Sequence, residues 1–391
     1  MPATAAAEPP RFLAMDQHKL RTGACLRWPP AFRTGSDPNT CCTRAAASCG
    51  IITIARGAPL GTQGAPSAAT LLPQQKVRRG SHFQDSALNA MAGSLFITGA
   101  SGFLGRHFLA SCEERWDGAV VCLSRQPRSG LPGSRARWMA GDLLEPAGYR
   151  AALGPDTTVV HLAAVTGKAD RAAYQRTNTE GTRALLRAGA EQGIRRFVLV
   201  SSIAARYGNL ESYPYGASKR DAERAVAASG LRYLIVRPTI VLGRESPIWQ
   251  KLSQLAGAAV VPVIGNGRAR VQPIHVRDVA RALVELVLRD ELTGTIELAG
   301  AEELSIRDLL ERIHGLMRGG KPHVLTIPYP PLRMLLELVE RSVPRLLPVT
   351  AGQLSIFVND SNVTADSTLR SLWPQMMTVD EMIRASQNGD A

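Results

Sequence analysis

Tyr215 and Lys219 stand four residues apart, so on a helix they share one face. A tyrosine that acts as an acid or base near neutral pH needs a lowered pKa, and a nearby ammonium group lowers it. Ser202, or its neighbour Ser201, ends an apolar run and offers a hydroxyl that could hold a substrate carbonyl or hydroxyl. The Tyr-x-x-x-Lys spacing alone equally describes a solvent-exposed pair on a helix surface.

A glycine-rich turn precedes these residues in LFITGASGFLG, positions 95–105. Gly99, Gly102 and Gly105 follow a short apolar run and stand at the start of an apolar helical pattern. Glycine permits a tight turn and lets the backbone approach a pyrophosphate without a Cβ in the way. The free N–H groups and positive dipole end of the following helix favour an anion. The turn therefore predicts a nucleotide phosphate site, although ordinary strand-to-helix turns share such patterns.

The chain from residue 94 alternates between short apolar runs and helical patterns. Strands are expected at 94–98, 119–124, 137–141, 158–162, 196–201 and 233–237, and helices at 102–115, 169–192 and 215–229. The run 119–124 is apolar almost throughout, as a strand covered on both faces should be. The alternation predicts an α/β fold with a Rossmann-type doubly wound parallel sheet, whose ligand lies at the carboxyl ends of the strands.

The pattern loosens after Pro238. A helix is expected at 276–289, a strand at 295–298, and a helix capped by Ser305 with Asp308 in capping-box spacing. The amphipathic stretch 332–343 could pack on its own core or contact a membrane or partner. We therefore predict a dinucleotide-binding domain at 91–240 and a smaller substrate-binding portion at 241–391.

Residues 1–90 are rich in Ala, Pro, Gly, Ser, Thr and Arg and show little periodicity, which predicts a disordered extension. Three explanations stay open. The true start could be Met91, because MAGSLFITGASGFLG begins there. The stretch could be a genuine flexible extension. It could also be a transit peptide, since it bears arginine and few acids, although it shows no clean amphipathic helix.

The net charge of +13 comes from 46 Lys+Arg against 33 Asp+Glu, and residues 1–90 contribute 10 basic and 4 acidic residues. No Lys/Arg run interleaved with aromatics is present, so we expect a solvated surface and no nucleic-acid partner. The balance would help hold a phosphorylated cofactor. No run of eighteen apolar residues predicts a membrane span, and the N-terminus lacks the pattern of a secretory signal.

Cysteine usage predicts no metal site, because no Cys-x-x-Cys pair has a partner pair. Two cysteines fall in expected core elements, which suits a reducing compartment and predicts a cytoplasmic location. The six cysteines are Cys25, Cys41, Cys42 and Cys49 in the N-terminal stretch, and Cys112 and Cys122 in the expected core.

Several runs together resemble the extended branch of the short-chain dehydrogenases/reductases, of the NAD-dependent epimerase/dehydratase type. The resemblance covers residues 95 to about 241. The runs are TGASGFLG (98–105), GDLLEP (141–146), VVHLAAVTGKA (159–169), NTEGT (178–182), VLVSS (198–202), YGASK (215–219) and VRPTIVLG (236–243).

The resemblance implies a catalytic triad of Ser202, Tyr215 and Lys219, with Asn178 supporting the active site. Packing of His161 near a strand end is compatible with it. The residues then expected around the cofactor are Gly99, Ser101, Gly102, Phe103, Leu104, Gly105, Ser124, Arg125, Asp142 and Leu143 (at adenine), Leu162, Ala163 and Ala164 (lining its channel), Asn178, Tyr215, Lys219 and Pro238.

The end of the second expected strand bears on cofactor choice. NAD-preferring enzymes usually carry an acid there for the ribose 2′-hydroxyl, whereas this chain has Ser124 and Arg125. An arginine fits a 2′-phosphate, so NADP(H) is favoured over NAD(H). A solvent-facing Arg125 is the plainer alternative.

Two features depart from sugar-nucleotide epimerases. Only 13 residues separate Ser202 from Tyr215, and the segment 265–280 loosely matches the place where those enzymes bind a pyrophosphate. Arg268 and Arg270 are candidates for that role, or are exposed loop arginines. The C-terminal part looks closer to the atypical branch with the accessory subunit of respiratory complex I, which typically lacks the Tyr/Lys pair.

The sequence thus predicts an NAD(P)-dependent oxidoreductase, epimerase or dehydratase acting on a hydroxyl or carbonyl of a small molecule, a sugar nucleotide or other. A cofactor that stays bound gives epimerisation or dehydration, and one that exchanges gives a reductase or dehydrogenase. The alternative is a non-catalytic NADPH-binding subunit or assembly factor of a respiratory-type complex. A homodimer also stays open.

Overall fold

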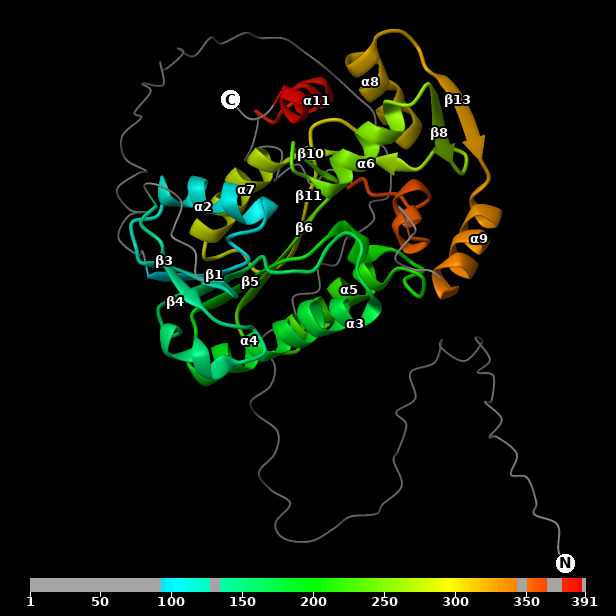
Figure 1. Ribbon diagram of the computed structural model, residues 1–391. Helices are drawn as coiled ribbons and strands as arrows, with labels where there is room; N and C mark the ends of the chain where they lie inside the picture. The colour runs from blue at the N-terminus through cyan, green and yellow to red at the C-terminus, as the bar shows by residue number, and fades with distance from the viewer. Residues whose placement is uncertain (1–92, 127–133, 343–349, 364–374, 389–391) are drawn as a thin grey trace, which may run out of the picture. The chain divides into compact units, whose positions relative to one another are not determined.

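The computed structural model describes residues 93–126, 134–342, 350–363 and 375–388 (Figure 1). The predicted extension at residues 1–90 lies outside this part of the chain, so its three explanations stay open.

A seven-stranded parallel sheet organises the described residues, in the order β11-β6-β5-β4-β1-β2-β3 (Figure 1). The chain runs outward from β1 to β3, then returns to β4 on the other side of β1. This reversal confirms the doubly wound fold and leaves a crevice at the carboxyl ends of β1 and β4. The strands are β1 (Ser94–Thr98), β2 (Val120–Ser124), β3 (Arg137–Ala140), β4 (Thr157–His161), β5 (Arg196–Val200), β6 (Tyr233–Pro238) and β11 (Gly294–Leu298).

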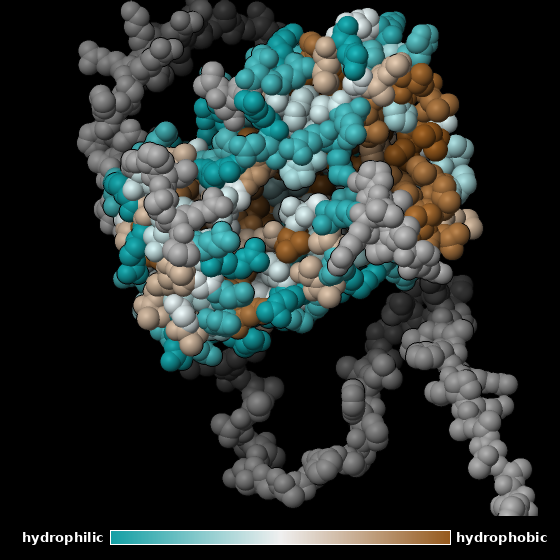
Figure 2. Space-filling model, in the orientation of Figure 1, coloured by the Kyte–Doolittle hydropathy of each residue, from teal (hydrophilic) through white to brown (hydrophobic). Residues whose placement is uncertain are grey.

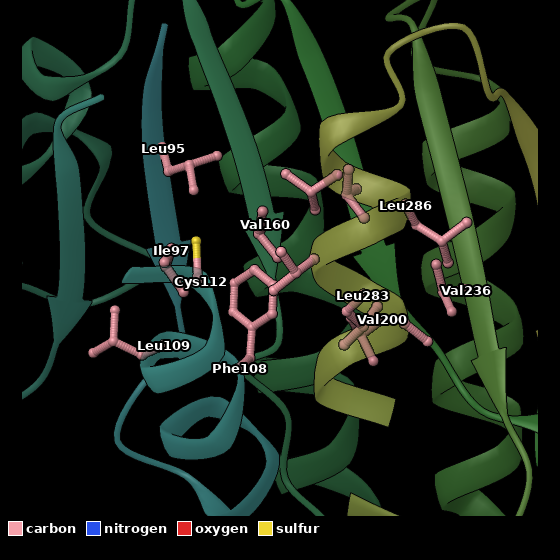
Figure 3. Packing of buried hydrophobic residues seen from close by; sticks show 14 of the residues in the cluster. Leu95, Ile97, Phe108, Leu109, Cys112, Val160, Val200, Val236, Leu283 and Leu286 are labelled. Carbon is pink, nitrogen blue, oxygen red and sulfur yellow. The ribbon is translucent and has the colours of Figure 1, made fainter. Parts of the chain in front are cut away.

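Helices cover both faces of this sheet. Alternate side chains of each strand point to opposite faces, and each set packs against its own pair of helices. Leu95 and Ile97 pack with Phe108 of α2 and Leu283 of α7 on one face (Figure 3), whereas Phe96 packs with Leu185 of α4 on the other, which α5 also covers. These helices are α2 (Phe103–Glu113), α4 (Gly181–Glu191), α5 (Pro214–Ala227) and α7 (Val276–Leu288).

The helix expected at 169–192 contains an irregularity that the sequence did not indicate. It is divided into α3 (Arg171–Tyr174), a π-helical turn (Gln175–Glu180) and α4. π-Turns arise where an extra residue is accommodated in a helix, often at functional sites.

A second hydrophobic core lies in the residues after β6. Its capping box at Ser305 and Asp308 is confirmed. The seventh strand of the main sheet and α7 also come from beyond residue 240, and the predicted domain division there stays a prediction. The remaining elements are β7 (Val241–Leu242), α6 (Pro247–Ala256), β8 (Val260–Ile264), β9 (Arg270–Val271), β10 (Ile274–His275), β12 (Leu304–Ser305), α8 (Ile306–Arg318), β13 (His323–Ile327), α9 (Tyr329–Ser342) and α11 (Val379–Asn388), with 3-10 turns at Pro146–Gly148, Arg150–Ala152, Ile203–Arg206 and Gly352–Phe357.

A fully buried arginine joins β5 to the chain that returns to the sheet. The Arg196 guanidinium donates to the carbonyls of Leu286, at 3.1 Å, and Leu292. The Leu286 carbonyl belongs to the last turn of α7, which has no helical partner for it. Arg196 therefore satisfies the helix end and fixes the start of β11 beside β6.

The glycine turn after β1 is held by close backbone contacts. Gly99 has a φ of +76°, and a Cβ there would lie 2.5 Å from the Ala163 nitrogen. A Cβ on Gly105 would lie 2.1 Å from the Gly99 carbonyl oxygen. Neither position accepts a side chain unless the backbone moves, so β1, α2 and the end of β4 meet only with glycine here.

We expect Gly105→Ala to lower the free energy of unfolding by about 1–3 kcal/mol, because the added methyl overlaps backbone atoms that have no rotamer to change. Urea denaturation measures the loss. Gly148→Ala is the matched control, since no atom lies within 4 Å of the added Cβ. Equal stability of the two variants would contradict the close packing of this turn.

Candidate active site

The predicted cofactor residues gather along the carboxyl edge of the sheet. The Gly141 N–H donates to the Ser124 carbonyl at 2.9 Å, which places Asp142 and Leu143 beside the end of β2. The Leu162 N–H donates to the Thr98 carbonyl at 3.0 Å, next to the glycine turn. Leu162, Ala163 and Ala164 follow β4 and are partly exposed, and Pro238 ends β6 and is buried.

The N-terminus of α2 is suited to an anion. Gly102 is its N-cap residue and supplies no side chain to the first turn, which also contains no acid. The N–H groups of Phe103, Leu104 and Gly105 therefore keep their hydrogen-bonding capacity at the positive end of an eleven-residue helix. Ser101 is partly exposed beside them. Turn and helix end fit a nucleotide phosphate.

Ser202, Tyr215 and Lys219 lie close together near the end of β5. Ser202 caps the 3-10 turn after β5 by accepting the Ala204 N–H at 3.2 Å. Its hydroxyl lies near that of Tyr215, in the first turn of α5, and acts to lower the pKa of that phenol. One turn on, the buried Lys219 ammonium donates to the Val200 carbonyl at 2.7 Å. A hydroxyl, a phenol and an ammonium thus converge on the end of β5.

The pKa of Tyr215 corrects the sequence-based expectation. Burial raises it, the nearby Ser202 hydroxyl lowers it, neighbouring Tyr174 raises it, and the net direction is upward. Burial lowers the pKa of Lys219 to about 8, against the attraction of Glu223. The predicted lowering at Tyr215 was wrong, because desolvation of the phenolate outweighs the groups that favour it.

Asn178 is anchored by the π-turn. Its Oδ1 accepts the Val165 N–H at 2.7 Å, and its Nδ2 donates to the Val165 carbonyl at 3.0 Å and to Ser218 Oγ at 2.9 Å. Ser218 in turn donates to the Tyr215 carbonyl at 2.8 Å. The chain after β4 and the first turn of α5 are therefore held by one buried amide.

A buried histidine extends this network to the glycine turn. His161 Nδ1 lies 2.6 Å from Thr98 Oγ1, and Nε2 lies 2.9 Å from Thr182 Oγ1. Thr182 donates its only hydroxyl proton to the Asn178 carbonyl at 2.6 Å, so Nε2 must donate to Thr182. Nδ1 must then accept from Thr98. Burial, with Lys219 adding repulsion, lowers the pKa of His161 to about 3, which keeps this neutral tautomer.

Three further tyrosines surround Tyr215. Its ring centroid lies 6.0 Å from that of Tyr174 and 5.8 Å from that of Tyr213, and Tyr207 stacks on Tyr213 at 6.2 Å. These aromatic faces form a wall, which we call the tyrosine wall, beside the candidate acid. Sequence reasoning missed Tyr174, Tyr207 and Tyr213, because nothing in their spacing relates them to Tyr215.

Other predicted residues lie as follows. Arg125 is exposed at the end of β2, and Ser201 has a buried hydroxyl that meets no hydrogen-bond partner among the described residues. Arg268 and Arg270 are exposed, and Arg270 pairs with Glu303 at 2.8 Å. Both arginines are therefore exposed, as in the second of the two alternatives given for them.

Cys112 and Cys122 are free and buried, and burial raises the pKa of each thiol to about 12. They are protonated core residues. Within the described ranges, no three His, Cys, Asp or Glu side chains group as a metal site. No helix in the same ranges is long and apolar enough to cross a membrane.

We expect acid to weaken the fold through His161. The pKa of His161 is about 3 in the folded chain and 6.5 without the contacts of the fold. The unfolded state therefore binds more protons between these two values, and the free energy of unfolding falls as the pH drops through this window. From pH 7.5 to pH 5 the loss attributable to His161 is about 2 kcal/mol. Urea denaturation of the protein and of His161→Asn, which keeps a donor and an acceptor, measures the pH-dependent part of the free energy of unfolding that comes from His161. A stability difference between them that is the same at both pH values would contradict the buried neutral imidazole.

The chain was compared with known proteins. The model of the NAD dependent epimerase/dehydratase family matches residues 95–297. "Ceramide reductase" of Caulobacter vibrioides is 33% identical over 242 residues, 61% of this chain and 74% of that protein. "dTDP-glucose 4,6-dehydratase" of Streptomyces griseus is 28% identical over 255 residues, 56% of this chain and 77% of that protein.

Solved structures give the same fold. The crystal structure of gox2253 superposes with a TM-score of 0.60 at 23% identity, over 76% of this chain and 99% of that one. The family match covers residues 95–297 of 391, which is over half of the chain. It includes the glycine turn, helix α5 with Tyr215 and most of β11. This chain is therefore a member of the NAD dependent epimerase/dehydratase family.

Proposed function

We propose that this protein is an NADP(H)-dependent reductase that converts a ketone of a largely apolar small molecule to an alcohol. The observation that carries the proposal is the meeting of the Ser202 and Tyr215 hydroxyls near the end of β5, one helical turn from the buried Lys219 ammonium. This arrangement can hold a carbonyl oxygen and deliver a proton to it.

Tyr215 acts as the general acid. Its raised pKa keeps the proton on the phenol at neutral pH, the state that carbonyl reduction requires. Ser202 orients this hydroxyl and polarises the substrate oxygen. Lys219 holds a positive charge near the site below about pH 8 and stabilises the phenolate that remains after proton transfer.

The bound cofactor would supply the hydride from the nicotinamide. The first turn of α2 would hold its pyrophosphate, and Gly99 and Gly105 would admit it without a Cβ. Ser201, with its unpartnered buried hydroxyl, would hydrogen-bond the nicotinamide end or the substrate.

An apolar substrate is favoured by the tyrosine wall and by one relative. Tyr174 and Tyr213 present aromatic faces beside the acid, which suit alkyl or amide groups better than a second charged phosphate. Arg270, a candidate for a sugar-nucleotide pyrophosphate, is already paired with Glu303. The relative named "Ceramide reductase" supports a keto derivative of a ceramide-type lipid as the first substrate to test. The cytoplasmic location and the homodimer stay predictions.

We expect Tyr215→Phe to lower kcat/KM by about 100-fold or more, because the general acid is removed. NADPH oxidation with a keto-ceramide measures turnover, and fluorescence titration checks that NADPH affinity is kept. Tyr233→Phe, a partly exposed tyrosine on β6, is the matched control. Unchanged turnover in Tyr215→Phe would remove the proposed mechanism, whereas NADPH binding without turnover of any carbonyl would favour the non-catalytic subunit.

We expect Arg125→Glu to weaken NADPH binding by about 10-fold or more with little effect on NADH, because an acid repels the 2′-phosphate that the arginine would bind. Arg183→Glu, an exposed arginine on α4, controls for net charge. Native mass spectrometry of the purified protein precedes the titrations. Tightly retained NAD+ would contradict the preference for NADP(H) and indicate an epimerase or dehydratase, which recycles its cofactor.

A further inference from the structure

A broad apolar surface lies over β8, β13 and α9 (Figure 2). We call it the apolar face. Its side chains are large and are exposed by 48%, 56%, 72%, 58% and 64% at Val260, Leu325, Met334, Leu335 and Leu338. Single exposed apolar residues need no explanation, but such a contiguous group marks an interaction surface.

The sheet part of this face follows from the register of β8 and β13. Val260 pairs with His323, and Pro262 pairs with Leu325, so these side chains share one side of the two-stranded sheet. Val261 and Val263 point to the other side and are fully buried in the second hydrophobic core, with α6 and α8. The outer side is open to solvent at Val260 and Leu325.

Helix α9 is apolar on two sides: Tyr329, Leu332 and Leu336 pack on the second hydrophobic core, whereas other apolar residues project outward. Its charged residues also bind the protein. Arg333 pairs with Glu337 at 2.7 Å and donates to Ser212 Oγ at 2.6 Å. Glu340 accepts the Ala351 N–H at 2.5 Å. Met334, Leu335 and Leu338 project from the exposed surface. A surface helix surrounded by water carries polar residues on its outer side, so this outer apolar side suits an apolar partner.

Basic side chains border the apolar face. Residues 312–336 contain Arg312, Arg318, Lys321 and Arg333 and no Asp or Glu. Arg312 and Arg333 are paired with acids, whereas Arg318 and Lys321 are exposed and have no ion pair within the described residues. Large apolar side chains beside unpaired cations complement a bilayer that carries anionic headgroups.

We propose that the apolar face binds the surface of an anionic lipid bilayer, with Met334, Leu335 and Leu338 entering the interface and Arg318 and Lys321 contacting lipid phosphates. A second copy of the chain is the other occupant, and the test below distinguishes it from a bilayer. The inference goes beyond the proposed reaction and rests on the surface alone, so either can fail without the other.

The test is flotation of the full chain with phosphatidylcholine vesicles, with and without 30% phosphatidylglycerol, at about 0.1 M salt. We expect binding to the anionic vesicles. Replacing Met334, Leu335 and Leu338 together by Ser should lower the partition coefficient at least about 10-fold, since most of the buried apolar area is lost. Arg318→Gln with Lys321→Gln should lower it by about 10- to 30-fold on anionic vesicles only.

The matched control exchanges the same positions within apolar chemistry: Met334→Leu, Leu335→Met and Leu338→Met should bind like the unaltered protein. NADPH titration and thermal unfolding confirm that each variant is folded. The proposal is overturned if the full chain ignores anionic vesicles, or if the serine variant floats as well as the unaltered chain. It is equally overturned if the serine substitutions turn a dimer into a monomer while no vesicle binding is seen, because a second copy would then cover the face.

Discussion

A neutral imidazole, that of His161, lies between two threonines and connects the glycine turn after β1 to α5, the helix that carries Tyr215. Only one tautomer of His161 fits these contacts. Thr182 donates its hydroxyl proton to the backbone carbonyl of Asn178, so Nε2 must donate to Thr182 and Thr98 must donate to Nδ1. These hydrogen bonds are buried, so water cannot replace one that is broken, and its loss leaves an unpaired polar group. The network therefore fixes the first turn of α5 relative to the carboxyl ends of β1 and β4.

The π-turn at Gln175–Glu180 explains how Asn178 reaches both sides of this network. A regular helix advances about 100° per residue, so one extra residue in a turn rotates all later side chains relative to the earlier ones. Tyr174 before the turn can then face Tyr215, while Asn178 within it faces Val165 and Ser218.

Local patterns predicted the strands of the main sheet up to β6, the glycine turn, the Ser305 cap and the Tyr215–Lys219 pair, because each depends on residues close in sequence. What depends on distant residues was not predictable. The threonine–histidine bonds join positions 63 and 21 residues apart, and their geometry exists only after the sheet forms. The direction of the Tyr215 pKa was wrong for a related reason: the sequence shows the ammonium at i+4 but not the burial that outweighs it.

A hydrogen bond links the apolar face to the tyrosine wall. Arg333 of α9 bonds Ser212, whose neighbour Tyr213 packs on Tyr215, so the surface that would meet a bilayer and the wall of the candidate active site are held by one contact. A long-chain ketone concentrates in a bilayer because its alkyl groups leave water there. An enzyme docked on that bilayer meets its substrate at the higher local concentration and needs less binding energy in its own pocket. A small aromatic wall beside Tyr215 would then suffice to orient the reacting carbon, and the membrane would supply most of the apolar attraction.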